Sequence, residues 1–170
     1  AAEPAKITEA VIPTSVTNTS NGRYYTVVGI TDNGFKNCVS LKSIQIPPTI
    51  NSIGKEAFSG CTALDKVDIT DLAAWWGINF VSNPATTAKK LYINGKIVND
   101  LVIPAGVATI SDNAFNNVES IQTLSTPESL KTIGYRAFYG CSKLKEAKFT
   151  QSLRYISDQT FDHASIADLI

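Results

Sequence analysis

The stretch IGKEAFSGCTAL, residues 53–64, returns as IGYRAFYGCSKL at residues 133–144. Both copies hold Ile, Gly, Ala, Phe, Gly, Cys and Leu at the same places. The phenylalanine of this phrase recurs at steps of 23 along the chain, except for one step of 57, as Phe35, Phe58, Phe115, Phe138 and Phe161. A fixed period of this length is typical of a stacked-repeat solenoid, in which every coil fills the same place in a shared core.

A second apolar position recurs upstream of the phrase at steps of 23 or 34, so two units are longer by 11. Its members are Ile12, Ile46, Ile69, Ile103, Thr126 and Phe149, and Pro follows the first, second, fourth and fifth of them. Three further columns are apolar in every unit read: Leu41, Leu64, Val98, Ile121 and Leu144; Ile44, Val67, Leu101, Leu124 and Ala147; Val16, Ile50, Val107, Leu130 and Leu153. Alternation such as Ile44-Gln45-Ile46 predicts short strands with one buried face. The spacing of Ala57, Phe58 and Cys61 predicts a single helical turn held by packing.

The two long units carry hairpin signals. Asn21-Gly22 precedes an apolar run, and Asn94-Gly95 lies between LYI and KIVNDLVIP. Asn-Gly between alternating apolar runs is a strong signal for a tight β-hairpin. Between residues 70 and 90 the repeat pattern breaks down: TDLAAWWGINF predicts a short helix capped by Thr or Asp, and VSNPATTAKK predicts a loop.

Composition excludes two classes of partner. The chain has 170 residues, 44% of them hydrophobic, with 15 Lys plus Arg and 15 Asp plus Glu. A zero net charge without any basic run argues against nucleic acid or an anionic membrane as the partner. No apolar run approaches the ~20 residues of a membrane-spanning helix. The absence of an initiating Met suggests a processed or trimmed product from which any export signal has been removed.

The columns C-x-x-L-x-x-[IV]-x-I-P and I-G-x-x-A-F-x-x-C resemble the bacterial BspA-like leucine-rich repeat family over about residues 11–165. The run DLAAWW…NP…LYINGK…LVIP resembles a variant unit of such proteins. The sequence departs from the pattern where Gly34 and Thr160 replace Ala, Val118 and Ala164 replace Cys, and Thr126 and Phe149 replace Ile. The resemblance implies an exported or cell-surface protein of bacteria or mucosal protists that acts in adhesion or protein binding, without catalysis.

We therefore expect an α/β repeat solenoid, a right-handed leucine-rich repeat of about six coils with a sequence period of 23 and two units extended by 11. Residues 1–10 are expected to form a leader or linker, and residues 11–170 a single solenoid with an irregular insertion around residues 70–100. Solenoids need capped ends. Either the chain is a fragment of a longer array, or its tail ASIADLI serves as the cap.

No catalytic, cofactor or metal site is expected. Cys38, Cys61 and Cys141 occupy one repeat column whose other members are Val118 and Ala164, which favours a buried apolar ladder over a disulfide or a metal site. A Cys38–Cys61 bridge stays possible from the spacing of adjacent coils. His163 is the only histidine and is interpreted as a solvent-facing residue of the last repeat.

Trp75, Trp76 and Tyr92 offer one candidate site. Exposed aromatic rings could stack on a sugar, which would make the chain a carbohydrate-binding module. The alternative is that the two tryptophans fill the core gap left by the irregular unit.

The outward positions of the predicted strands offer the other candidate site, a mixed-charge strip on one curved sheet. Its proposed members are Gln45, Lys66, Asp68, Glu146 and Lys148. Extended surfaces of this kind bind partners in solenoid proteins. The first functional hypothesis is therefore a non-enzymatic, secreted or cell-surface adhesion module for a protein partner, and the glycan-binding module is the alternative.

Overall fold

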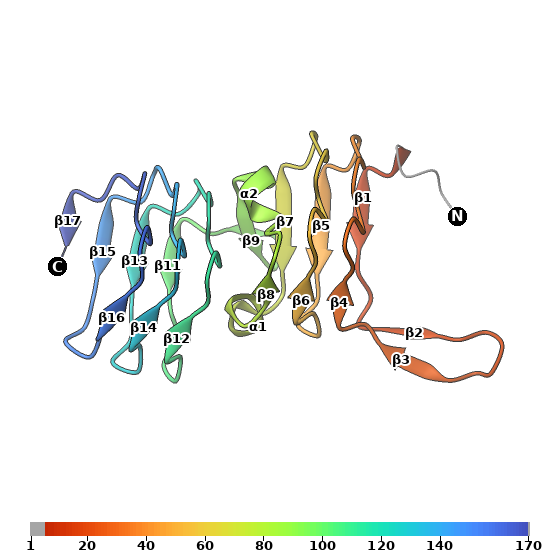
Figure 1. The fold of residues 1–170 in the computed structure, drawn as a ribbon, viewed down its shortest axis with the longest axis horizontal. Coiled ribbons are helices and arrows are strands. Elements are labelled where there is room, and N and C mark those ends of the chain that lie inside the picture. The colour runs from red at the N-terminus through yellow and green to blue at the C-terminus, as the bar shows by residue number, and fades with distance from the viewer. Residues whose placement is uncertain (1–5, 170) are drawn as a thin grey trace.

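The computed structural model describes residues 6–169 and shows an elongated stack of short parallel strands (Figure 1). Two sheets follow one another along the stack. The first front sheet has the order β1 (Glu9–Val11), β5 (Ser43–Ile46), β7 (Lys66–Ile69), β9 (Leu91–Ile93) and β10 (Lys96–Ile97). The second front sheet has the order β11 (Asp100–Val102), β13 (Thr123–Ser125), β15 (Glu146–Lys148) and β17 (Asp168–Leu169).

Two smaller sheets complete the coils. The first side sheet holds β4 (Gly29–Ile30), β6 (Ser52–Ile53) and β8 (Asn79–Phe80), and the second holds β12 (Thr109–Ile110), β14 (Thr132–Ile133) and β16 (Tyr155–Ile156). Their strands are parallel, as are those of the front sheets except β10. The chain thus winds in successive coils that each contribute one front strand and one side strand, and the predicted repeat solenoid is confirmed.

The registers show that the sequence columns stack as predicted within each half of the stack: Ile44 pairs with Val67, and Leu124 pairs with Ala147. Between the halves the columns were wrong, because Val67 pairs with Leu91 and Ile69 with Ile93, where the columns placed Leu101 and Ile103. The inward side chains of β5, β7, β11, β13 and β15 are buried. β1 begins at Glu9 and pairs with β5, so the stack starts before residue 11, where the sequence placed its beginning. Residues 1–5 of the predicted leader, and residue 170 of the tail, lie outside the described residues.

The phenylalanine phrase forms a turn and not the predicted helical turn. In each copy, two residues four positions apart both have positive φ, and Phe lies midway between them. The pairs are Asn33 and Asn37, Glu56 and Gly60, Asn113 and Asn117, Arg136 and Gly140, and Gln159 and His163. Left-handed residues interrupt the right-handed backbone that a helix needs. The backbone N–H groups consequently point to the next coil: Phe35 N–H donates to Ala57 O (2.7 Å) and Phe115 N–H to Ala137 O (2.8 Å).

The glycine after Ile in the phrase is required by close packing of coils. A Cβ at Gly54 would lie 2.4 Å from Asp32 Oδ1, and one at Gly134 would lie 2.5 Å from Asp112 Oδ1. Each of these carboxylates accepts a hydrogen bond from the residue after the glycine, at 2.7 Å for Lys55 N–H and 2.8 Å for Tyr135 N–H. Asp and Gly therefore act as a pair that joins consecutive coils.

The core consists of ladders of like side chains. The Phe35 and Phe58 rings stack with centroids 5.2 Å apart, Phe115 and Phe138 also at 5.2 Å, and Phe138 and Phe161 at 5.4 Å. The three cysteines are free and buried, so the possible Cys38–Cys61 bridge is not formed. Cys141 Sγ donates to Phe115 O (3.1 Å), and Cys61 Sγ donates to Phe35 O (3.0 Å). Cys61 and Cys141 thus fill the core, and each satisfies the carbonyl of the phenylalanine one coil earlier.

The buried thiols give a pH-dependent prediction. Burial raises the pKa of Cys141 from its ordinary 9.0 to about 12. The folded chain therefore holds this proton to higher pH than the unfolded chain does, and the stability it contributes is full below pH 9.0 and lost as pH rises toward about 12. In urea unfolding, the wild-type protein should lose stability relative to Cys141→Val between about pH 8 and about pH 10.5. A difference between the two proteins that stays constant across this range would contradict the prediction.

Both predicted hairpins are present. β2 (Ser15–Thr17) and β3 (Tyr24–Thr26) form an antiparallel arm that projects from the stack near the N-terminal end (Figure 1). β9 and β10 are joined through Asn94 and Gly95, both with positive φ, as a tight hairpin requires. One column residue differs from the prediction: Val16 lies on the projecting arm and is exposed, because the extra residues of its unit leave the stack.

The irregular unit contains two short helices. α1 (Leu72–Trp76) is capped as predicted, by Asp71, whose carboxylate accepts from Ala73 N–H at 2.7 Å. The predicted loop after it contains α2 (Ala85–Ala88), which follows Asn83-Pro84. Asn83 Oδ1 accepts a hydrogen bond from Ala85 N–H (2.8 Å), the first backbone N–H of α2. This bond stabilises the start of the helix and accounts for the difference from the predicted loop.

A seam crosses the solenoid between the irregular unit, residues 70–98, and the following coils. β10 ends the first front sheet and β11 starts the second, and neither side sheet crosses this boundary. Within residues 6–169, one backbone–backbone hydrogen bond crosses it, from Ser120 N–H to Lys89 O at 3.3 Å. Side chains supply most of the other polar links. The two halves are therefore joined by a different chemistry from that which joins regular coils.

Three side chains of the irregular unit replace the missing backbone ladder at the seam. Trp75 Nε1–H donates to Ala114 O (2.8 Å), and Asn83 Nδ2 donates to Asn113 O (2.8 Å) and to Ala114 O (3.1 Å). Thr86 Oγ1 donates more weakly to Asn116 O, at 3.4 Å. In the regular coils, the equivalents of Ala114 O accept from the Phe N–H of the preceding coil.

Candidate functional site

The outward faces of the front sheets carry the candidate residues that the sequence placed on a single strip. In the first front sheet, Val11, Gln45, Asp68 and Tyr92 lie side by side in register across four strands. A second register row contains Glu9, Ser43 and Lys66 on three neighbouring strands. These side chains alternate with the buried ones along each strand because successive residues of a strand face opposite sides of the sheet.

The outward residues Val11, Gln45, Lys66, Asp68 and Tyr92 of the first front sheet form what we call the first front patch. Lys66 and Asp68 are bonded to each other at its centre. Lys66 Nζ lies 3.0 Å from Asp68 Oδ2 and 5.1 Å from the centre of the Tyr92 ring. Asp68 Oδ1 accepts from Gly95 N–H at 3.0 Å, and the Asp68 side chain is only 14% exposed. The carboxylate thus holds the β9–β10 turn, while Lys66, Gln45 and Tyr92 present the accessible polar and aromatic surface.

The second front sheet carries a separate patch. Lys148 Nζ pairs with Glu146 Oε1 at 2.9 Å, and Thr123 Oγ1 donates to Asp100 Oδ1 at 2.7 Å. Val102 is 64% exposed and continues, through Ser125, the row that contains Lys148. Exposed ion pairs of this kind contribute little to stability, so these charges are free to change partners.

The five candidate residues are therefore divided between two sheets. Gln45, Lys66 and Asp68 lie on the first front sheet, and Glu146 and Lys148 lie on the second. The antiparallel strand β10 separates them, which differs from the continuous strip expected from the sequence. The hairpin was predicted, but the register columns alone do not show that it ends one sheet.

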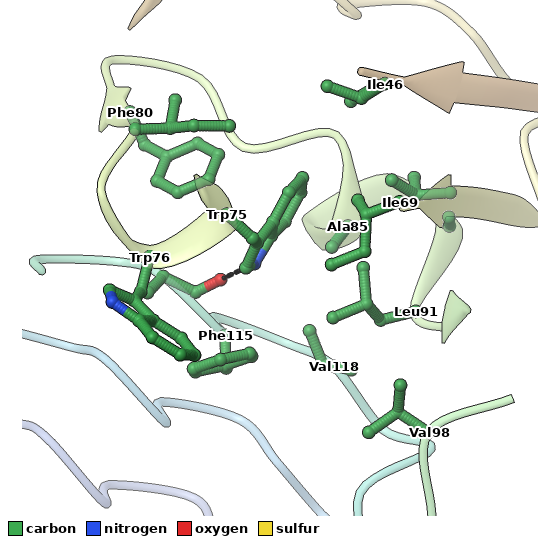
Figure 2. Close-up of a cluster of buried hydrophobic side chains, with 14 of the residues drawn as sticks. Ile46, Ile69, Trp75, Trp76, Phe80, Ala85, Leu91, Val98, Phe115 and Val118 are labelled. Atoms are coloured by element: carbon green, nitrogen blue, oxygen red, sulfur yellow. Dashed lines mark hydrogen bonds between the residues drawn. The ribbon is translucent and has the colours of Figure 1, made fainter. Parts of the chain in front are cut away.

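Both tryptophans lie in the core. Trp75 is 1% exposed and Trp76 is 7% exposed. Figure 2 shows Trp75 between Phe80 and Ala85, with its indole nitrogen bonded across the seam, and Trp76 directed toward Phe115. The Trp75 and Phe80 rings are 4.8 Å apart. As the chain is folded, neither indole offers a face on which a sugar could stack, and the interpretation that they fill the irregular gap fits their positions. Tyr92 belongs to the first front patch instead.

In the described part of the chain, the other chemistry-bearing side chains do not gather into a site. Among residues 6–167, no group of three or more His, Cys, Asp and Glu side chains is arranged to hold a metal ion. His163 is exposed at a left-handed turn position, and its ring packs edge-on against Tyr139 at 5.0 Å. The described part of the chain also contains no helix of the length and hydrophobicity needed to cross a bilayer.

The site residues proposed from the sequence did not include the apolar members of the two patches, although Val102 occupies an outward position of a predicted strand. Val11 is 70% exposed and lies beside Gln45, and Val102 is on the corresponding row of the second sheet. A candidate strip chosen by charge leaves Val102 out, and Val11 belongs to β1, which falls at the edge of the repeat pattern. Apolar residues at outward strand positions were the available signal.

The stacked parallel coils with short strands and buried Leu, Ile and Phe ladders define a leucine-rich repeat solenoid. The chain belongs to the BspA type leucine rich repeat family, whose model matches it in six copies over residues 3–80, 28–96 and 85–170. No curated protein matches the chain.

Two solved structures are similar along almost the whole chain. A leucine rich cell surface protein of Faecalibacterium prausnitzii is 24% identical, with a TM-score of 0.63, over 96% of this chain and 47% of its own. A leucine-rich repeat protein of Bacteroides ovatus is 28% identical, with a TM-score of 0.56, over 95% of this chain and 45% of its own. The chain thus spans less than half the length of either protein.

Proposed function

We propose that the chain is a non-enzymatic binding module, displayed on a bacterial cell surface or secreted, that recognises a protein partner through its two front-sheet patches. The observation that carries this proposal is the first front patch itself. Val11, Gln45, Asp68 and Tyr92 lie in one register row with Lys66 beside them, so apolar, aromatic and charged groups alternate on one sheet. Such a mixture suits a protein interface, which combines apolar and aromatic contacts with polar ones.

Family membership supports the same proposal. The chain is a BspA type leucine-rich repeat, and one similar solved structure is a cell surface protein. The zero net charge of the chain and the paired charges of each patch offer no field that would attract a polyanion. The partner is therefore a protein surface read by shape and short-range contacts.

The proposal is tested by immobilising the chain and measuring binding to a panel of purified mammalian extracellular-matrix and epithelial ectodomain proteins, with a glycan array in parallel. Saturable binding to a member of the protein panel that front-sheet variants weaken would support it. Binding only to glycans, or protein binding that no front-sheet variant affects, would refute it.

Four alanine variants should weaken this binding without loss of fold. We expect Gln45→Ala, Lys66→Ala, Glu146→Ala and Lys148→Ala each to lower affinity by roughly two- to fivefold, because side chains around an interface centre typically cost up to about 1 kcal/mol when truncated. Their melting temperatures should stay within about 2 °C of wild type, as for other surface substitutions. Arg154→Ala, which removes an exposed charge away from the front sheets, is the matched control and should bind normally.

Asp68→Ala should behave differently from these four. Its carboxylate accepts from Gly95 N–H and pairs with Lys66, so its removal leaves the β9–β10 turn less well held. We expect a loss of about 1 kcal/mol of unfolding free energy together with weaker binding. Unchanged stability of Asp68→Ala in urea unfolding would show that this carboxylate does not hold the β9–β10 turn.

A further inference from the structure

The irregular unit takes a shorter path than the other coils. From Ile53 to Val67 the chain advances 14 positions, whereas from Phe80 to Leu91, their partners in register, it advances 11. Ile110 to Leu124 and Ile133 to Ala147 are again 14 apart. This coil is three residues shorter, and α2 lies where the other coils have the outward phenylalanine turn.

The place of the missing turn is a cavity of about 440 Å³, which we call the notch. On one side it is lined by Glu56, Phe58 and Gly60 of the preceding turn, and on the other by Asn113 and Asn116 of the following one. Asn83 lies between them, with both polar atoms engaged: Nδ2 donates to Asn113 O, and Oδ1 accepts from Ala85 N–H. The notch thus lies between two turns that would be neighbours of the absent one.

The backbone donors on one side of the notch lack their usual acceptors. In the preceding coil, Asn33, Phe35 and Asn37 donate N–H groups to Lys55 O, Ala57 O and Ser59 O at 3.0, 2.7 and 2.7 Å. The corresponding donors of the next coil are the N–H groups of Glu56, Phe58 and Gly60. None of these three has a hydrogen-bond acceptor anywhere in residues 6–169.

On the opposite side of the notch, two of the three carbonyl oxygens that would face the absent turn are already satisfied. Ala114 O accepts from Trp75 and Asn83, and Asn116 O accepts from Thr86. The side chain of Glu56 is also engaged, by Lys36 Nζ of the preceding coil at 2.5 Å, so this residue has its backbone N–H left to offer. The unpaired groups of the notch are therefore mainly backbone N–H donors, which lie on one side at alternate residues and would pair with oxygen acceptors.

We propose that the notch binds a short peptide segment of a partner protein, whose backbone carbonyl oxygens accept from the N–H groups of Glu56, Phe58 and Gly60. The same three positions in the preceding coil bond to carbonyl oxygens of alternate residues in a polypeptide, so the spacing of the donors already matches a peptide chain. A main-chain ladder of this kind supplies affinity without strong demands on the ligand's sequence.

A peptide fits this site better than a sugar does. The rings that line the notch, Phe58 and Phe80, are buried, with 2% and 8% exposed, and so give no open face for stacking. Both front-sheet patches lie on other residues. The notch is consequently a second binding site, independent of the function proposed above.

The first measurement is amide hydrogen exchange of the full chain by NMR. The N–H of Phe58 should exchange at least about tenfold faster than those of Phe115 and Phe138, which have the same place in the turn and bond to Ala137 O and Thr160 O. Equal protection of all three would show that the donors are not free and would overturn the proposal.

The second measurement identifies the ligand class with a phage-displayed library of random dodecapeptides and a glycan array. An enriched peptide should slow exchange at Glu56, Phe58 and Gly60. Thr87→Trp places a ring at the notch from an exposed position of α2. It should weaken binding of the peptide by at least about tenfold, because the ring occupies the space that the peptide main chain needs. Ser142→Trp, at an exposed position of a regular coil, is the control and should leave the affinity unchanged.

The proposals for the notch and for the front-sheet patches can be refuted independently of each other. A notch peptide should bind equally to Gln45→Ala and Lys148→Ala, which test the front sheets. Enriched peptides that depend on the front sheets, sugars that protect the three N–H groups, or a library that yields no ligand for the notch would each overturn the peptide assignment. None of these results would affect the test of the front-sheet proposal.

Discussion

Phe138→Ala should lower the free energy of unfolding by about 4 kcal/mol, the usual cost of removing a fully buried aromatic side chain. Phe138 is completely buried and stacks on two rings, with centroids 5.2 Å from Phe115 and 5.4 Å from Phe161. Its truncation leaves a cavity between two coils that are tied by backbone hydrogen bonds and so have little freedom to close it. Urea unfolding followed by circular dichroism measures the loss.

Two further variants show whether the ladder is responsible. Phe161→Ala, in a ring that is only partly buried, should cost about half as much because the cavity opens to solvent. Tyr155→Ala removes a ring of similar size from an exposed position of β16 and should change stability by less than about 0.5 kcal/mol. A loss in Phe138→Ala no larger than that in Phe161→Ala would show that stacking between coils is not the main source of stability.

Asn83→Ala should cost about 3 kcal/mol and should also divide the unfolding transition in two. Its side chain makes three hydrogen bonds, to Asn113 O, Ala114 O and Ala85 N–H, and leaving such buried groups unpaired is expensive. In stacked repeats, cooperative unfolding depends on the interface energy between neighbours. A weaker seam should let the two halves unfold separately.

Tryptophan fluorescence reports on this transition directly because the chain has only Trp75 and Trp76, both close to the seam. In the wild-type protein, fluorescence and circular dichroism should give one midpoint, and in Asn83→Ala they should give two. Asn83→Asp keeps the acceptor for Ala85 but loses both donations, so it should resemble the alanine variant. Asn79→Ala, at an exposed position of β8, is the control. Coincident transitions in Asn83→Ala would mean that the seam is held by apolar packing instead.

The repeat columns were sufficient to predict the solenoid, since each column position must meet its copy in the next coil. Ile44 and Val67, for example, are one repeat period apart and pair in register. The turn geometry was not predictable from apolar spacing, because Ala57 and Phe58 fit a helix equally well. The signal was in the polar residues: Asn at positions 33, 37, 113 and 117 favours the left-handed conformation that a helix cannot contain.

Of the candidate surface, the sequence predicted which residues face outward but not which strands share a sheet. Alternation along a strand identifies which residues face outward, and Lys66, Gln45 and Lys148 do so. Whether neighbouring strands form one sheet depends on the path between them. The loss of the phenylalanine turn between Phe80 and Leu91 follows from three residues fewer in that coil, and the break in the sheet follows from the β9–β10 hairpin. Column matching finds the irregular length of this unit but does not show either structural change.

The seam also has a mechanical consequence. When a chain of stacked coils is stretched from its two ends, the load passes from coil to coil, and each regular junction shares it among many parallel backbone hydrogen bonds. Between residues 6 and 169, the seam has one such bond, from Ser120 to Lys89, and relies on a few side chains for the rest. Tension applied along the stack should therefore separate the two halves there first, while each half keeps its own fold. A protein built in this way would lengthen in a defined step under tension instead of unravelling from one end.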